Sequence, residues 1–195
     1  MRCILKYLGN KSGRGEPSRL FINAVSQETC DMQGKAMKIS IICVGKIKEQ
    51  YFRDAISEYV KRLGKYCKLE IIEVADEKTP DKAGKALEEQ IKEKEAGRIL
   101  KHLKEDAYIY SLEIKGEMPD SLSFAAQLDK LAQQGKSHIQ FIIGGSLGLH
   151  SSVSKAANRA VSFSDMTFPH QLMRVILLEQ IYRSYRIISG EPYHK

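Results

Sequence analysis

The chain has 195 residues, of which 43% are hydrophobic and 28% are charged, a composition typical of a globular protein with one well-buried domain. Its net charge is +7, and residues 1–36 contribute +3 of this, with six Lys or Arg against three Asp or Glu. Such a mild excess permits a nucleic-acid partner without requiring one. No segment approaches the roughly 20 apolar residues that span a bilayer, and the charged start lacks the apolar core of roughly 7–15 residues of a secretory signal. We therefore expect a cytoplasmic protein.

The cysteines and histidines show no pattern that would favour a metal site. The four cysteines, Cys3, Cys30, Cys43 and Cys67, form no CxxC pair and have no metal-ligand spacing, and the five histidines are scattered. We expect free thiols of a reducing compartment and no bound metal.

Residues 1–36 differ in pattern from the rest of the chain. They contain the turn-rich stretch KSGRGEPS and sustain no hydrophobic period, whereas the β-branched run of a buried strand begins directly after Met37. We predict that 1–36 is an extension, poorly ordered or not part of the functional protein, and that 37–195 is the domain. The alternative is an accessory segment in which SRLFINAV forms a short helix.

Strand and helix patterns alternate after Met37. The strand patterns cover residues 38–45, 69–74, 107–113, 139–145 and 161–168. The helix patterns cover residues 48–63, 81–104, 121–134, 152–160 and 170–189. Asp120 is expected to cap the third helix and Gly135 to end it. This alternation predicts a single α/β domain, with a mostly parallel sheet and helices on both faces.

The last helix pattern, 170–189, is apolar around nearly its whole circumference. A helix on one side of a sheet needs only one apolar stripe, so the surplus favours burial against a second copy in a homodimer. The alternative is a deeply buried central helix, which a sheet this small can hardly enclose.

Ligands in parallel sheets bind beyond the carboxyl ends of the strands. Three of these ends, 112–115, 144–149 and 167–170, are therefore expected to converge on a binding site. The middle one, GGSLG at 144–148, fits the G-x-S-x-G turn of serine hydrolases. However, the acid and histidine that would complete a triad with Ser146 are Asp165 and His170, which follow too closely to come from separate later loops.

Nucleotide cradles are also disfavoured, because the chain lacks a P-loop and its glycines do not follow the first strand. Glycine backbone at a strand end can instead admit a flat, neutral or cationic ligand. The apolar side chains of Phe163, Met166 and Phe168 could wall such a pocket, which would suit an adenosine group carrying a sulfonium.

Several blocks of the chain, taken in order, resemble the RlmH family of small SPOUT-class methyltransferases that act on large-subunit ribosomal RNA. The blocks are VGKIKEQYFRDAISEYVKRLGKY, IIGGSLGLH, SFSDMTFPHQLMRVILLEQIYR and the terminal EPYHK, and the resemblance covers 37–195. It implies a C-terminal trefoil knot and a homodimer. It also implies transfer of a methyl group from S-adenosylmethionine to N3 of a pseudouridine in 23S RNA of the assembled ribosome.

The resemblance also assigns roles to individual residues. The implied cofactor contacts are Leu112, Gly144, Phe163, Ser164, Asp165, Met166, Thr167 and Phe168. His170 and His194 are candidate proton acceptors for the imide N–H, although bulk water is an alternative. Tyr193 could stack on a base while His194 and Lys195 meet phosphate, unless this end of the chain is simply disordered.

The candidate contacts to the RNA backbone are Arg174, Arg183 and Arg186 on the last helix, with Lys46 and Lys48 after the first strand. Each could equally be a solvated surface charge. A non-catalytic module that binds RNA or the ribosome with the same fold is the alternative function.

Overall fold

The computed structural model describes residues 37–80 and 82–193, in which strands and helices alternate as predicted. The strands are β1 (Lys38–Val44), β2 (Lys68–Val74), β3 (Tyr108–Glu117), β4 (His138–Ile143) and β5 (Arg159–Val161). The helices are α1 (Gln50–Leu63), α2 (Lys85–Leu100), α3 (Ser121–Gln133), α4 (Ser151–Ala156) and α5 (His170–Ile188). The predictions for 1–36, His194 and Lys195 lie outside the described residues.

All five strands form one parallel sheet in the order β2-β1-β4-β3-β5. Strand β1 lies between β2 and β4 and places Ile39 opposite Leu69 of β2 on one side and opposite Ile139 of β4 on the other. The predicted parallel sheet is therefore confirmed. The trefoil knot is not decided by strand order, because threading depends on the path of the connections, so it stays a prediction.

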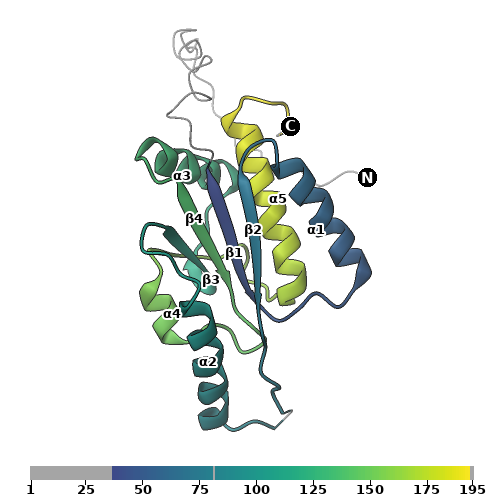
Figure 1. Ribbon diagram of the computed structural model, residues 1–195, viewed down its shortest axis with the longest axis vertical. Coiled ribbons are helices and arrows are strands. Elements are labelled where there is room, and N and C mark those ends of the chain that lie inside the picture. Colours follow the sequence, from purple (N-terminus) through teal and green to yellow (C-terminus); the bar gives the residue numbers. More distant parts are fainter. Residues whose placement is uncertain (1–36, 81, 194–195) are drawn as a thin grey trace, which may run out of the picture. The chain divides into compact units, whose positions relative to one another are not determined.

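Helices cover both faces of the sheet, as predicted (Figure 1). On one face, α5 packs between α1 and α3, over alternate strand residues such as Ile41 and Phe141. On the other face, α2 and α4 pack over the intervening positions, including Ile42 and Ile142. This alternation follows from the period of two in a strand, which sends successive side chains to opposite faces.

The caps of α3 and the two cysteines that the structure describes agree with the sequence-based expectations. The Asp120 carboxylate accepts a 2.7 Å hydrogen bond from the backbone N–H of Ser123, and Gly135 follows α3 with φ of +76°. Cys43 and Cys67 are free and buried in the core. Burial raises the pKa of each thiol to about 12.

Several predicted boundaries near β3 and β5 were wrong. The helix predicted at 152–160 ends at Ala156, and Arg159 and Ala160 belong to β5. The strand pattern at 161–168 is mostly a loop, because β5 ends at Val161 and the Ser164 hydroxyl then accepts a hydrogen bond from the Met166 N–H. The third strand is longer than predicted and reaches Glu117, whose carbonyl accepts a hydrogen bond from the Ser162 N–H. The loop 162–168 is thereby tied to the end of β3.

Candidate functional site at the carboxyl ends of the strands

Three neighbouring strands bring the segments that we predicted to contact a cofactor to one rim of the sheet. Leu112 of β3 pairs with Ile143 of β4 and with Val161 of β5, so these three positions lie side by side. Gly144 directly follows Ile143, and Phe163 comes two residues after Val161. The expected ends at 112 and 144 therefore lie side by side, but the third strand end is Val161, not the predicted segment 167–170, because β5 stops there.

The glycine segment 144–148 is a tight turn. The Gly148 N–H donates a 3.1 Å hydrogen bond to the carbonyl of Gly145, and Gly148 has φ of +80°. A Cβ atom on Gly144 would lie 2.9 Å from the Gly148 carbonyl carbon, closer than side chains allow. Ser146 is exposed, and no hydrogen bond joins it to His170 or Asp165 within the described residues. The turn therefore presents backbone to the rim, not an activated serine.

The loop 162–168 directly follows β5 and lies at the rim. The ring of Phe163 packs edge-on against Phe124 of α3, with ring centroids 5.7 Å apart, so it is anchored in the core. Asp165, Met166 and Thr167 are exposed, and 72% of the Met166 surface is accessible. The loop combines apolar side chains with one carboxylate, that of Asp165, which is the only charged group in residues 162–168.

His170 begins α5 and lies at the same rim, next to the end of β1. A Cβ atom on Gly45 would be 3.4 Å from His170 Nε2 and 3.8 Å from the Asp76 carboxyl carbon. Burial and the charge of Arg174 lower the pKa of His170, while Asp76 opposes this shift. The imidazole is therefore neutral at pH 7 and able to accept a proton. Gly45 and Asp76 were not predicted as site residues, although Gly45 directly follows β1 and Asp76 lies two residues after the end of β2.

Arg174, one turn further along α5, is buried, with 1% of its surface exposed. Its guanidinium donates to the carbonyl oxygens of Val44 and Gly45, at 2.9 and 2.6 Å, and pairs with Glu73 at 2.7 Å. The prediction that Arg174 contacts RNA is wrong, because the guanidinium is enclosed and engaged inside the chain. It instead ties α5 to the ends of β1 and β2.

The comparisons with known proteins agree with this architecture. Residues 37–194 match the family model described as "Predicted SPOUT methyltransferase". The chain belongs to the SPOUT methyltransferase family.

Among its relatives is the ribosomal RNA large subunit methyltransferase H of Bifidobacterium adolescentis, which is 62% identical over 159 residues. Proteins of the same name from Bifidobacterium animalis subsp. lactis and Clostridium acetobutylicum are 58% and 56% identical over the same length. In each case the alignment covers 82% of this chain and all of the relative. As a member of this family the chain is a methyltransferase, and it needs a methyl donor.

Three predicted residues near the C-terminus, Arg183, Arg186 and Tyr193, lie toward the end of α5 that is far from His170. The Tyr193 ring packs edge-on against Tyr182 with centroids 5.2 Å apart, and the Arg183 guanidinium lies 4.7 Å from the Tyr193 ring centre. Arg183 pairs with Glu179, and Arg186 pairs with Glu191. At 1.5 Å per residue, Tyr182 and Arg183, which contact the Tyr193 ring, lie about 18–20 Å along α5 from His170. Within one chain of this SPOUT methyltransferase, Tyr193 and His170 are therefore not brought together.

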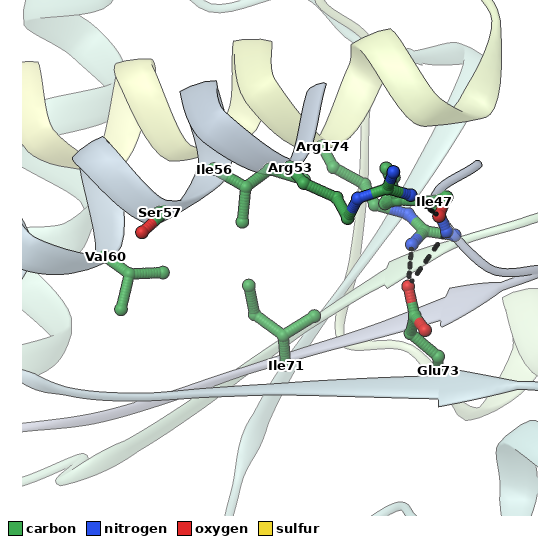
Figure 2. A pocket seen from close by; sticks show the side chains of 8 residues that line it. All are labelled: Ile47, Arg53, Ile56, Ser57, Val60, Ile71, Glu73 and Arg174. Atoms are coloured by element: carbon green, nitrogen blue, oxygen red, sulfur yellow. Dashed lines mark hydrogen bonds and ion pairs between the residues drawn. The ribbon is translucent and has the colours of Figure 1, made fainter. Parts of the chain in front are cut away.

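A separate hollow of about 400 Å³ lies between α1 and β2 (Figure 2). It is lined by Ile47, Arg53, Ile56, Ser57, Val60, Ile71, Glu73 and Arg174. None of these residues is a predicted cofactor contact. Its two cations already have partners, since Arg53 donates to the carbonyl oxygens of residues 47 and 48 and Arg174 pairs with Glu73. The hollow therefore offers phosphate no free cation, and we do not assign the methyltransferase site to it.

Neither a membrane span nor a metal cluster is found in the described part of this SPOUT methyltransferase. No described helix is both long and apolar enough to cross a bilayer. Nor do three or more His, Cys, Asp or Glu side chains gather there in a way that could hold a metal ion.

Proposed function

We propose that this chain transfers a methyl group from S-adenosylmethionine to N3 of a pseudouridine in 23S ribosomal RNA, within the assembled cytoplasmic ribosome. The observation that carries the proposal is the convergence of Leu112, Gly144 and the loop 163–168 on one rim. This rim occurs in a chain that matches ribosomal RNA large subunit methyltransferases H over their whole length.

The residues at the rim fit the proposed methyl donor. Gly144 has no room for a side chain, because Gly148 and Leu149 fill the space beside it, so a donor at this position would meet backbone. Leu112 and Phe163 are half-buried apolar side chains that pack on the core. We propose Leu112, Gly144 and 163–168 as the residues that hold the donor. Of these, only Asp165 is charged, which is compatible with a cationic ligand. The sulfonium of the bound donor supplies an activated methyl group.

The acceptor nitrogen must lose a proton to become a nucleophile, and His170 is our proposed base. It lies at the rim, it is half-buried, and its lowered pKa keeps the ring neutral at pH 7. A positioned base of this kind contributes roughly 10²–10⁴-fold to a rate. His194 remains the alternative base, but it lies outside the described residues.

We further propose that the enzyme is a homodimer. The outward side of α5 carries apolar side chains, including Leu172, Val175 and Ile176, that the sheet and the neighbouring helices cover only partly. The C-terminal segment with Tyr193, His194 and Lys195 follows the far end of α5, so a second copy is the simplest way to bring it to the rim. At the rim, the Tyr193 ring would stack on a nucleobase of the RNA.

RNA contacts are proposed for Lys46 and Lys48, with Arg183, Arg186 and Lys195 as further candidates. Lys46 and Lys48 are exposed, and the backbone N–H of Lys48 donates to the Gln171 side chain, directly after His170. Arg183 and Arg186 are partly buried and paired with carboxylates, so a phosphate would have to compete with these partners.

The catalytic unit is proposed to be 37–195. The family match begins at residue 37, and the named relatives are aligned over their full length without 1–36. A chain that begins at Met37 is therefore expected to be active.

The test is mass mapping of 23S RNA from a strain in which the corresponding gene is deleted. We expect the loss of one methyl group from a single pseudouridine, and its return when a chain beginning at Met37 is supplied. An unchanged RNA mass would overturn the proposal. Calorimetry with S-adenosylmethionine separates the enzyme from a non-catalytic RNA-binding module, which should give no heat. Labelling of Ser146 by a fluorophosphonate would instead point to hydrolysis.

A further inference from the structure

Glu95 is a buried carboxyl that the proposed mechanism does not use. It lies on α2, which is otherwise rich in exposed charges, but only 5% of its own surface is accessible. A carboxyl group taken out of water costs free energy unless it is hydrogen-bonded. Burial accordingly raises the pKa of Glu95, and the charge of Asp76 adds to this effect.

The Glu95 side chain touches two segments at the carboxyl ends of the strands. Its Oε1 accepts a 3.0 Å hydrogen bond from the backbone N–H of Glu77, which lies just beyond β2. Its two oxygens also fill the space beside Gly145, where an added Cβ would lie 3.0 Å from Oε2 and 3.3 Å from Oε1. One carboxyl group therefore spans from the segment after β2 to the glycine turn after β4.

This contact bears on the part of the turn that faces the proposed donor. Gly145 is bonded to Gly148 across the turn, and Gly144 precedes it directly. The packing of Gly144 against Gly148 leaves the turn little freedom on that side. The carboxyl of Glu95 closes off the other side, because it occupies the space into which Gly145 could otherwise shift.

We propose that Glu95 is a positioning residue for the methyl donor. It holds the turn 144–148 in the position in which the backbone of Gly144 contacts the nucleoside of the donor. The inference rests on the proposed function. Glu95 acts through the reach and shape of its side chain: it must extend to the Glu77 N–H and fill the space beside Gly145. A full negative charge is not needed for either contact.

Two substitutions of Glu95 distinguish the effect of side-chain length from the effect of the negative charge. Glu95→Gln keeps the length of the side chain and an acceptor oxygen for the Glu77 N–H, but removes the ionisable group. Glu95→Asp keeps the carboxyl group, but its side chain is shorter by one methylene. It is therefore too short to reach the Glu77 N–H and to fill the space beside Gly145. The matched control is Glu93→Asp, because Glu93 lies on the same helix with its side chain exposed.

The measurement is calorimetric binding of S-adenosylmethionine to the full chain, accompanied by thermal unfolding of each variant. We expect Glu95→Asp to weaken binding at least about tenfold, which is about 1.4 kcal/mol. Glu95→Gln should stay within about threefold of the unsubstituted protein, and Glu93→Asp should not differ from it. In turnover assays, the loss in Glu95→Asp should appear mainly in KM for the donor, with a smaller change in kcat.

The two possible failures can be told apart. If the unsubstituted protein does not bind S-adenosylmethionine, the proposed function fails. If it binds, but Glu95→Asp binds equally well, the positioning role of Glu95 fails while the function stands. Equal losses in Glu95→Asp and Glu95→Gln would also overturn the inference, because they would show that the charge matters and not the reach. Should Glu95→Asp fail to fold, loss of binding in folded Glu95→Gln would still contradict the inference.

Discussion

The two ends of α5 both carry arginine, but the structure uses the side chains in opposite ways. One turn into the helix, Arg174 is enclosed, and its terminal guanidinium nitrogens donate to two backbone carbonyls and to Glu73. At the last turns, Arg183 and Arg186 lie over aromatic rings and pair with Glu179 and Glu191 at the surface. Buried groups are costly to disturb and surface pairs are not, so the same residue type should have very different effects at the two ends. The following substitutions test this contrast.

The largest effect is expected at His170, on activity and not on stability. Replacing His170 with Asn removes the proposed base and should lower kcat by about 10²-fold or more, with little change in the affinity for S-adenosylmethionine. Because the pKa of His170 is lowered, the rate of the unsubstituted protein should fall only below about pH 6.5, as the ring becomes protonated. The variant should lack this fall. An unchanged kcat would point to His194 or water as the proton acceptor.

Arg174→Ala should have the largest effect on stability. It leaves Glu73 without its cation and two carbonyl oxygens without a donor, which typically costs about 3–5 kcal/mol when a buried pair is broken. Urea unfolding measures this loss. Arg183→Ala is the matched control on the same helix and should cost less than about 1 kcal/mol. Similar costs for the two substitutions would contradict the difference between the ends of α5.

A smaller loss is expected for Tyr193→Ala. The substitution removes the edge-on contact with Tyr182 and the contact with the Arg183 guanidinium, together worth about 1–2 kcal/mol. Tyr51→Ala serves as the comparison, because 64% of the Tyr51 surface is exposed, and it should change the unfolding free energy by less than about 0.5 kcal/mol. A neutral effect of Tyr193→Ala would contradict a stabilising contact between this ring and Tyr182 of α5.

The smallest effect is expected at Glu191. Lys65, Tyr66 and Arg186 lower the pKa of this carboxyl, so its contribution to stability is present at neutral pH and is lost as the pH falls below about 4. Glu191→Gln should therefore lower Tm slightly at pH 7, and this difference in Tm should decrease as the pH falls below about 4. The difference in Tm at pH 7 should also be smaller in 1 M salt, where interactions between exposed charges are screened over a length of roughly 3 Å.

Most of the fold could be predicted because its signals are local. Alternating buried strands, the Asp120 cap and the Gly135 stop can each be recognised within a few residues. The loop 162–168 was mistaken for a strand because Phe163 and its neighbours alternate polar and apolar side chains, as a half-buried strand does. Only its hydrogen bonds, such as that from Met166 to the Ser164 hydroxyl, distinguish it.

The site was predictable only in part. Topology predicted the strand ends 112–115, 144–149 and 167–170 at one rim, because the carboxyl ends of parallel strands meet at the same edge. The assignment of 163–168 as cofactor contacts came from the family resemblance. The burial of Arg174 could not be predicted, since its partner Glu73 is 101 positions away and no spacing in the sequence links them. Glu95 was missed for a similar reason: it lies in a charged helix, and its contacts are with segments that precede and follow it at a distance.

The burial of both described thiols has a practical consequence for labelling. With pKa values near 12, Cys43 and Cys67 hold almost no thiolate at neutral pH and should resist maleimides. In a chain beginning at Met37, a single cysteine introduced at an exposed position would then be the reactive one. A spin label or fluorophore attached at either end of α5 could report how two copies align, with no need to remove the natural cysteines first.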